Sequence, residues 1–423
     1  MNQIAKYRRC ITTVSLIGFC ILLFAQCVNR ENDKKANDKV ASSTDSTRDP
    51  VDLAQFAGSA SCAGCHKNIY DSHIHTAHYL TTRPALEKYI KGSFEKGKNR
   101  YAYDSGRVVV MEKRDSGLYQ VGYYQGTEKV AGRFDIVVGS GSKGQTYITR
   151  FHQQLYQLPV SYFTAAGSWA NSPLYPTYPV LFNRPITSRC LECHSTFVKV
   201  VSAPGIEPEE FDSQMIYGID CERCHGPAAR HVAFQSRNPK ETTGKYIINP
   251  ASFSRKQRLD LCALCHGGRM QKTKPSFGFV AGDKLADYFM VDTVRPDPEQ
   301  VDVHGNQYGL LRSSKCFMMS PDMTCNTCHN PHENERGNIA LFSSRCITCH
   351  NKEHNSFCKI SGRAGPSLVK NCIDCHMPLQ PSKSITELLP GDTKPTAALI
   401  RSHLIAIYPD ETIHQKPGLP KIH

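Results

Sequence analysis

The chain has 423 residues, 19 cysteines and a formal net charge of +13 at pH 7. A charge of this sign ordinarily suggests nucleic acid or an anionic membrane as a partner. So many cysteines are unusual in a cytosolic protein, which disfavours an intracellular role and favours export.

The N-terminal 27 residues have the pattern of a secretion signal. Lys6, Arg8 and Arg9 precede an apolar run over residues 11–25. This run has the length of a signal-peptide core and is too short for a full membrane span. We therefore expect export across a bacterial inner membrane.

The end of this signal resembles a lipoprotein signal, in which Cys27 would become the lipidated first residue of the mature chain. Gln26 stands where a small residue is usual. The alternatives are ordinary cleavage or retention of the segment as a marginal anchor. Residues 28–56 are polar and charged, which predicts a disordered linker ahead of a domain formed by residues 57–423.

Seven copies of the pattern Cys-x-x-Cys-His occur along the chain. Two thiols three positions apart on one helical turn can both bond the vinyl groups of one porphyrin, and the next residue supplies an imidazole to its iron. Paired cysteines also build zinc sites, but zinc does not require a histidine after every pair. The sequence thus predicts seven covalent haem c groups. The predicted attachment residues are Cys62, Cys65, Cys190, Cys193, Cys221, Cys224, Cys262, Cys265, Cys325, Cys328, Cys346, Cys349, Cys372 and Cys375. The predicted proximal iron ligands are His66, His194, His225, His266, His329, His350 and His376.

The predicted haems change what the net charge of +13 implies about binding partners. Seven haems would bring about fourteen propionates, partly offset by about one positive charge on each ferric iron core, so only a few net charges remain. The basic residues are then expected to compensate propionates, and nucleic acid is not expected as a partner. The macrocycles would also supply buried apolar surface, so an aromatic content of 9% is compatible with a packed interior.

Residues 68–89 follow the first motif and have a helical pattern that Pro84 interrupts. His73, His75 and His78 lie on adjacent turns of this pattern. One of them is expected to ligate a haem iron.

Residues 100–150 have a different period. Runs of β-branched and aromatic residues at 108–111, 118–124 and 134–138 are separated by glycine-containing turns, which predicts a small antiparallel sheet. The glycine-rich residues 139–144 lack the spacing of a phosphate-binding loop, so nucleotide binding is not expected.

Residues 158–185 contain the only tryptophan, Trp169, and many Pro and Tyr residues. They are expected to be extended chain packed on porphyrin faces, with the lining of a substrate channel as the alternative. The motifs from Cys190 onward follow at short intervals, so neighbouring haems should lie close together. The expected fold is mainly α with little regular secondary structure, organised around stacked haems, with a small β insertion near residues 100–150.

The motifs supply one axial ligand for each iron, so the second must come from elsewhere. A histidine just past one motif cannot easily reach its own haem but can reach a neighbouring one. A propionate hydrogen bond or solvent exposure is the alternative for each residue. The expected distal ligands are His78, His231, His304, His332 and His403, with His354 and His152 as further candidates.

Cys316 and Cys358 belong neither to the motifs nor to the signal segment. In an oxidising compartment a disulfide between them is the first expectation. A thiolate ligand on one haem is the alternative, and it would suit the chemistry of sulfur compounds.

The motifs and their neighbours resemble the multihaem cytochromes c related to the tetrahaem cytochrome of ammonia oxidisers, the pentahaem nitrite reductases and hydroxylamine oxidoreductase. The resemblance covers most of residues 57–408. The residues that carry it are Cys62-Ala-Gly-Cys-His with Thr76-Ala-His, Cys221-Glu-Arg-Cys-His-Gly-Pro with His231, and Cys372-Ile-Asp-Cys-His-Met-Pro with Arg401-Ser-His. It implies a mostly helical fold with stacked and perpendicular haem pairs, and it implies the five distal histidines named above.

The chain also departs from this family. It has no Cys-x-x-Cys-Lys motif, which provides the catalytic lysine in the nitrite reductases, and residues 100–150 have no counterpart in the compact enzymes. An activity is therefore not carried over from the resemblance.

Three functions remain open. The first is a heptahaem electron carrier, in the periplasm or as an outer-membrane lipoprotein of a Gram-negative bacterium, that serves quinol-linked enzymes or other cytochromes. The second is an oxidoreductase for nitrite, hydroxylamine or tetrathionate at one haem with an open position. The third is a structural or docking subunit whose sheet binds a partner.

Overall fold

The computed structural model describes residues 51–291, 297, 301–302, 304–351, 353, 358 and 370–408. All of them belong to one unit, Pro50–His423. The predicted signal segment, Cys27, most of the linker, and His354 lie outside the described residues. Within the described ranges, no helix combines the length and the apolar character needed to cross a membrane.

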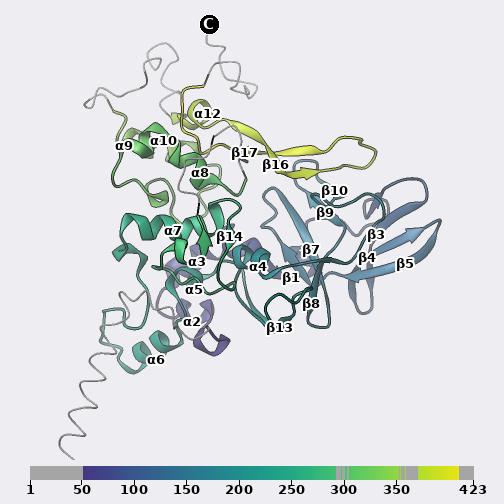
Figure 1. Cartoon of the computed structure of the whole chain (residues 1–423), viewed down its shortest axis with the longest axis horizontal. Helices are drawn as coiled ribbons and strands as arrows, with labels where there is room; N and C mark the ends of the chain where they lie inside the picture. Colours follow the sequence, from purple (N-terminus) through teal and green to yellow (C-terminus); the bar gives the residue numbers. More distant parts are fainter. Residues whose placement is uncertain are drawn as a thin grey trace, which may run out of the picture. The chain divides into compact units, whose positions relative to one another are not determined.

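Strands and helices contribute almost equally to the chain, with 27% of residues in strands and 26% in helices. The expectation of a mainly α fold with a small β insertion is therefore wrong. The β region begins before residue 100 and continues beyond residue 150, and three further hairpins lie among the haem motifs. In Figure 1 the sheets and the short helices that carry the motifs occupy different parts of the unit.

Two antiparallel sheets form the β region. The larger sheet has seven strands, which are β1 (Thr82–Pro84), β6 (Ile136–Val138), β7 (Gly144–Phe151), β8 (Gln154–Gln157), β9 (Val160–Phe163), β10 (Ser168–Asn171) and β11 (Arg184–Pro185). The smaller sheet has four strands in sequential order, which are β2 (Arg100–Ala102), β3 (Arg107–Arg114), β4 (Gly117–Tyr124) and β5 (Thr127–Arg133). The predicted runs 108–111, 118–124 and 134–138 lie on β3, β4 and β6, so the prediction of strands there is confirmed.

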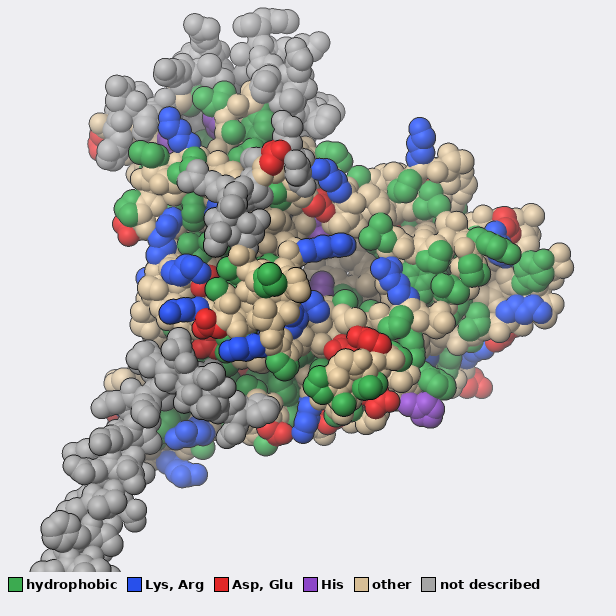
Figure 2. All heavy atoms as spheres, in the orientation of Figure 1, with side chains coloured by type: hydrophobic (Ala, Val, Ile, Leu, Met, Phe, Trp, Pro, Cys, Tyr) green, Lys and Arg blue, Asp and Glu red, His purple; other side chains and the backbone are tan. Residues whose placement is uncertain are grey.

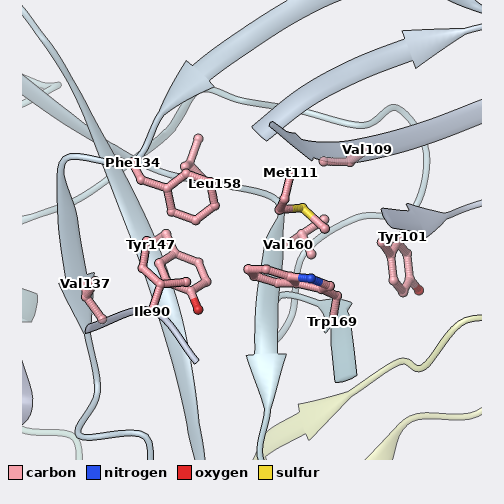
Figure 3. Packing of buried hydrophobic residues seen from close by; sticks show 10 residues of the cluster. All are labelled: Ile90, Tyr101, Val109, Met111, Phe134, Val137, Tyr147, Leu158, Val160 and Trp169. Carbon is pink, nitrogen blue, oxygen red and sulfur yellow. The ribbon is translucent and has the colours of Figure 1, made fainter. Parts of the chain in front are cut away.

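Trp169 lies at the centre of the β-region core and is 2% exposed. Its ring packs 5.7 Å from Tyr147 and 6.3 Å from Phe134, and Met111 is also fully buried there (Figure 3). A side-chain carbon on Gly92 would come within 2.1 Å of the indole, so the ring needs a glycine at that position. The expectation that this stretch packs on porphyrin faces is therefore wrong for Trp169, because its partners are protein side chains.

The helices are short. The longest in the haem-motif region, α7 (Arg255–His266), begins with a capping box in which the Ser254 hydroxyl accepts from the Gln257 amide. The helices around the motifs are α2 (Ser59–Ala63), α3 (Lys67–His73), α4 (Ser188–His194), α5 (Cys221–His225), α6 (Ala229–Arg237), α8 (Gln307–Arg312), α9 (Lys315–Met319), α10 (Ile339–Ile347), α12 (Ile373–His376) and the 3-10 helix η7 (Cys325–Thr327). Helices this short cannot bury a wide apolar stripe of their own, so their stability must come from neighbouring groups.

The predicted helix over residues 68–89 is much shorter in the structure. Helix α3 ends at His73, and a 3-10 turn η3 (Tyr79–Thr81) leads into strand β1. Thr82 pairs with Val138, and the Gly139 amide donates to the Thr81 carbonyl at 2.6 Å. Pairing with β6 therefore overrides the local helical pattern.

Three hairpins lie outside the two large sheets. They are β12 (Ser195–Val200) with β13 (Phe211–Tyr217), β14 (Gln271–Lys272) with β15 (Phe289–Met290), and β16 (Leu379–Glu387) with β17 (Thr396–Arg401). The β16–β17 hairpin contacts the β region, since the Asn171 amide donates to the Leu388 carbonyl at 3.0 Å and Lys143 donates to the Leu399 carbonyl at 2.7 Å.

Glu387 is the last residue of β16 and is 3% exposed, and its Oε2 has no hydrogen-bond partner in the described part of the chain. Burial raises its pKa from 4.5 to about 8. The folded state therefore keeps a proton that the unfolded state loses above pH 4.5, so stability falls as pH rises towards 8. At about 1.4 kcal/mol for each pKa unit, the loss by pH 7 is about 3 kcal/mol.

We expect Glu387→Gln to flatten this part of the pH profile, because an amide does not ionise. Thermal unfolding of the purified protein at pH 5 and pH 8, followed by circular dichroism, measures the effect. The wild type should lose more stability between the two pH values than the variant does. Parallel pH profiles would show that the Glu387 carboxyl does not titrate in this range.

Candidate haem-binding sites

Each Cys-x-x-Cys-His motif lies on one helical turn. Motifs two, three and four lie in α4, α5 and α7, and the fifth begins in η7. In the first motif the His66 amide donates to the Cys62 carbonyl at 2.8 Å, and the equivalent bond in the seventh joins His376 to Cys372 at 3.0 Å. This turn brings both thiols to one side, with the imidazole immediately after them, which is the geometry that attachment to one porphyrin requires.

Four pairs of histidine rings lie at nearly the same separation, and three of them contain a motif histidine. The ring centroids are 6.1 Å apart for His78 and His266, 6.1 Å for His225 and His332, and 6.2 Å for His329 and His403. Two imidazoles that hold one metal ion from opposite sides have centroids about 6 Å apart, since each ligating nitrogen lies about 2 Å from the metal. Each of these three pairs joins one motif histidine to one expected distal histidine, whereas the fourth pair, His73 and His332 at 6.2 Å, contains no motif histidine.

Several motif histidines are oriented through their Nδ1 atoms. Nδ1 lies 2.9 Å from the Ile248 carbonyl oxygen in His225 and 2.8 Å from the Ala406 carbonyl oxygen in His376. A ring whose Nδ1–H donates to such an acceptor keeps the lone pair of Nε2 for a metal. His194 and His266 make the same kind of contact, to the Thr81 hydroxyl at 3.0 Å and to the Gln307 side-chain oxygen at 3.2 Å.

Burial keeps the facing rings neutral. It lowers the pKa of His78, His194 and His403 to about 4, with smaller contributions from neighbouring histidines. Burial also lowers the pKa of His266 and of His329. Iron binding needs the neutral imidazole, so these surroundings suit ligation.

The paired rings of His78 and His266 are open to solvent. His78 and His266 keep accessible surface although protein surrounds them closely enough to depress their pKa. Figure 2 shows a hollow near the centre of the visible face, with histidine side chains inside and Lys or Arg side chains at its rim. Basic side chains at the rim suit the propionates that the predicted haems would carry.

His304 and His231 lie beside motif histidines without forming a close ring pair. His304 is among the groups that depress the pKa of His194, and its Nδ1 lies 3.3 Å from the Ser384 hydroxyl. The Nδ1 of His231 lies 2.8 Å from the Lys245 carbonyl oxygen. Burial is the main cause that lowers the pKa of His225, and His66 and His231 both contribute, which places both residues near His225 of the third motif.

The other histidine candidates have different surroundings. His73 is buried, and its Nε2 is 3.1 Å from the Ile219 carbonyl oxygen, so that nitrogen is already engaged. His75 is exposed. His152 is exposed on the turn between β7 and β8, where it has a positive φ of 52°, so the suggestion that it ligates iron is not supported.

The first and third motifs are joined by a buried carboxylate. Glu222 of α5 is 3% exposed and accepts from the amides of Ala57 and Gly58 at 2.8 Å, at the start of the helix that carries Cys62. The thiols of Cys62 and Cys221 are also in contact, and this contact lowers the pKa of Cys62. The attachment points of the two motifs are therefore adjacent.

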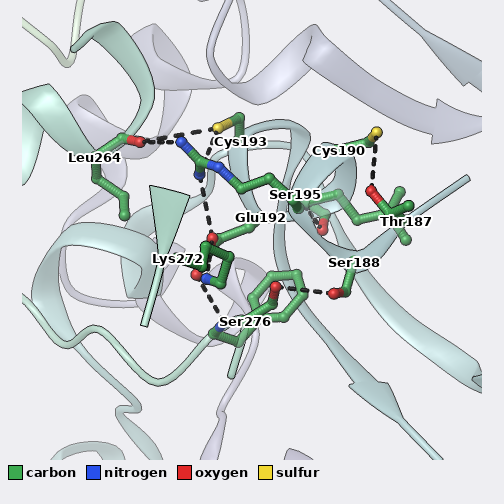
Figure 4. Close-up of polar contacts among 12 residues, drawn as sticks. Thr187, Ser188, Cys190, Glu192, Cys193, Ser195, Leu264, Lys272 and Ser276 are labelled. Carbon is green, nitrogen blue, oxygen red and sulfur yellow. Dashed lines mark hydrogen bonds and ion pairs between the residues drawn. The ribbon is translucent and has the colours of Figure 1, made fainter. Parts of the chain in front are cut away.

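The second and fourth motifs are joined by a polar network (Figure 4). Arg189 donates to the Leu264 carbonyl at 3.0 Å and to the Cys193 sulfur at 3.1 Å. Glu192 is fully buried and accepts from Lys272 at 2.8 Å. The thiols of Cys193 and Cys265 lie in contact, which lowers the pKa of Cys193. Here again two attachment points are adjacent.

The last three motifs form a continuous series. Arg345 on α10 donates to the Cys328 carbonyl at 2.6 Å and pairs with buried Glu335. Ser343 on the same helix accepts from the Cys372 amide at 3.0 Å. The fifth motif in turn meets the fourth, since Cys325 and Cys262 are in contact and this lowers the pKa of Cys325.

Cys316 and Cys358 do not form the expected disulfide, and both are free thiols in the structure. Burial raises the pKa of Cys316, and the nearby Cys349 of the sixth motif adds to the increase. Cys358 contributes in the same way at Cys372, where burial is the main cause of a raised pKa. The two thiols thus lie near different motifs.

The groups that orient the imidazoles could not be predicted from the sequence. Thr81, Gln307 and the carbonyl groups of Ile248 and Ala406 have no sequence pattern that points to a haem ligand. All four come from segments more than 20 residues away from the histidine they contact, so spacing could not have found them.

One solved structure has a fold similar to that of this chain. The fold is similar to that in the crystal structure of the outer cell wall cytochrome OcwA, with a TM-score of 0.53 and 18% sequence identity, over 85% of this chain and 81% of that one. No family model matches, and no curated protein matches. The chain thus has a fold similar to that of a cytochrome. The narrower resemblance to nitrite reductases and hydroxylamine oxidoreductase stays a prediction.

Proposed function

We propose that this protein is an exported heptahaem c-type cytochrome that carries electrons between redox partners. The observation that supports this most strongly is that each of the seven motifs lies beside at least one other, so that together they form one connected array. Haem supplies one-electron chemistry, and the protein contributes position, ligands and electrostatics. Electrons can pass through the protein only if neighbouring haem sites lie close together without a gap.

The contacts between motifs define an order. The first motif meets the third through Glu222, and the fourth, fifth, sixth and seventh follow through the contacts of Cys262, Arg345 and Ser343. The thiol of Cys224 also acts on that of Cys262, which links the third motif to the fourth. The second motif lies beside the fourth through Arg189. We infer a chain of six sites with the second site as a side branch.

The facing histidines support two imidazole ligands at most sites. We assign His332 to the third site, His78 to the fourth and His403 to the fifth, from the ring pairs near 6 Å. We assign His304 to the second site from its position beside His194, and His231 to the first site because His231 and His66 both lie near His225. Irons with two imidazole ligands change oxidation state with little rearrangement, which suits a carrier.

The partners in this proposal are proteins of an electron-transfer chain, such as quinol-linked enzymes or other cytochromes. Export follows from the signal-like N-terminus, and lipidation of Cys27 would hold the protein at a membrane. The cysteine content also favours export, because 19 cysteines are unusual in a cytosolic protein.

Ligand binding to the ferric protein tests the carrier. We expect an EPR and resonance Raman spectrum dominated by low-spin signals that do not change with added nitrite, hydroxylamine or cyanide. A high-spin signal that shifts with one of these compounds would contradict a pure carrier and would support an enzyme.

The second candidate is an oxidoreductase for a small nitrogen or sulfur compound, centred on the seventh site. His376 is oriented through its Nδ1 by the Ala406 carbonyl at 2.8 Å, and at this site, as at the sixth, we assign no distal histidine. In this candidate the high-spin signal described above disappears when His376 is replaced. Persistence of the signal in a His376→Met variant would exclude the seventh site.

A further inference from the structure

The imidazole of His304 is connected to a carboxylate through one hydroxyl group. Its Nδ1 lies 3.3 Å from the Ser384 Oγ, and that hydroxyl is in close contact with the Asp302 carboxylate. Ser384 lies on strand β16, about eighty residues further along the chain. A segment distant in sequence thus reaches the expected distal ligand of the second site.

Asp302 is held firmly in place. Its carboxylate accepts from the Lys383 amide at 3.0 Å, from the Ser382 hydroxyl at 3.2 Å and from the His304 amide at 3.2 Å. Ser382 is 2% exposed, so this end of the connection is shielded from water. The Asp302 carboxylate is the acceptor in each of these hydrogen bonds.

The direction of the connection follows from this. A carboxylate cannot donate, so the Ser384 hydroxyl gives its hydrogen to Asp302, and its oxygen accepts from the Nδ1–H of His304. The proton therefore lies on Nδ1, and Nε2 carries the lone pair. Among the Nδ1 contacts described above, this is the one that continues to a side-chain carboxylate.

We propose that Ser384 and Asp302 are positioning residues that select the Nε2-ligating tautomer of His304 and lower the reduction potential of the haem at the second site. An imidazole whose N–H donates towards negative charge is a more basic ligand and favours the ferric iron. The second site, which is the side branch of the array, would then hold its electron less readily than sites whose ligands contact neutral groups. This inference rests on the proposed haem at that site.

The test is a potentiometric titration of the full-length holoprotein, followed by EPR and visible spectra. In Ser384→Ala one haem should shift to a more positive potential while the others keep theirs, and its signal should stay low-spin. Ser384→Thr keeps the hydroxyl and should restore the wild-type potential. Asp302→Asn should shift the same haem in the same direction, and the double variant should add little to either single change.

Thr396→Ala provides the matched control, since Thr396 is an exposed residue on the paired strand of the same hairpin. It should change no potential. Unchanged potentials in Ser384→Ala, or equal shifts in Ser384→Ala and Thr396→Ala, would overturn the inference. A haem count that does not include the second site would overturn the proposed function instead, so the two failures are distinguishable.

Discussion

Replacing His78 by alanine is expected to convert one low-spin haem to a high-spin one and to interrupt the array. His78 faces His266 at 6.1 Å, and the fourth motif lies between the third and the fifth. Loss of this ligand raises the reduction potential of the fourth haem. We expect an added barrier to electron passage of about 1.4 kcal/mol, which slows the transfer about tenfold. EPR of the ferric protein and stopped-flow reduction measure the two effects.

His75→Ala is the matched control for this change. His75 comes from the same segment and, like His78, is exposed, but it forms no ring pair with another described histidine. The control should keep the wild-type spectrum and rate. If His78→Ala also keeps the full low-spin signal, His78 is not the distal ligand of the fourth site, and the assignment from ring separation is wrong.

Replacing Glu222 by alanine should be the most destabilising of the changes considered. Its carboxylate accepts from the amides of Ala57, Gly58 and Ala228 at 2.7 to 2.8 Å while it is 3% exposed. Removing it leaves three amides without this acceptor, for an expected loss of about 3–5 kcal/mol. Thermal or denaturant unfolding of the purified protein measures the loss.

Glu222→Gln separates the hydrogen bonds from the packing. The amide oxygen can still accept from Ala57 and Ala228, while its NH₂ group meets the Gly58 amide, so we expect roughly half the loss. Glu241→Ala is the control, because that carboxylate is exposed and accepts from nearby Thr243 at 2.8 Å. Equal stabilities for Glu222→Ala and Glu241→Ala would contradict the joining role of Glu222.

The distal histidines could be predicted from their positions relative to the motifs. His332 comes three residues after the fifth motif and cannot reach its own iron, so a neighbouring haem was the natural expectation, and it faces His225 of the third motif. His403 likewise faces His329 from a segment beyond the last motif. These pairs agree with the ligand expectations, although the haems themselves stay a prediction.

The β content could not be predicted in the same way. Strands β9 and β10 are only four residues each, and they come from a Pro- and Tyr-rich stretch that we expected to pack against porphyrin. Their stability comes from Trp169, which packs with Tyr147 and Phe134 from other strands, and local sequence does not contain such contacts. The seven motifs each predict a helical turn, and this led us to expect a mainly helical fold.

Intact mass spectrometry of the purified exported protein tests the central claim most directly. The account predicts a single covalent adduct of seven haems, with both thiols of each motif consumed. A smaller number of haems, or motif thiols that still react with an alkylating reagent after denaturation, would contradict the heptahaem array.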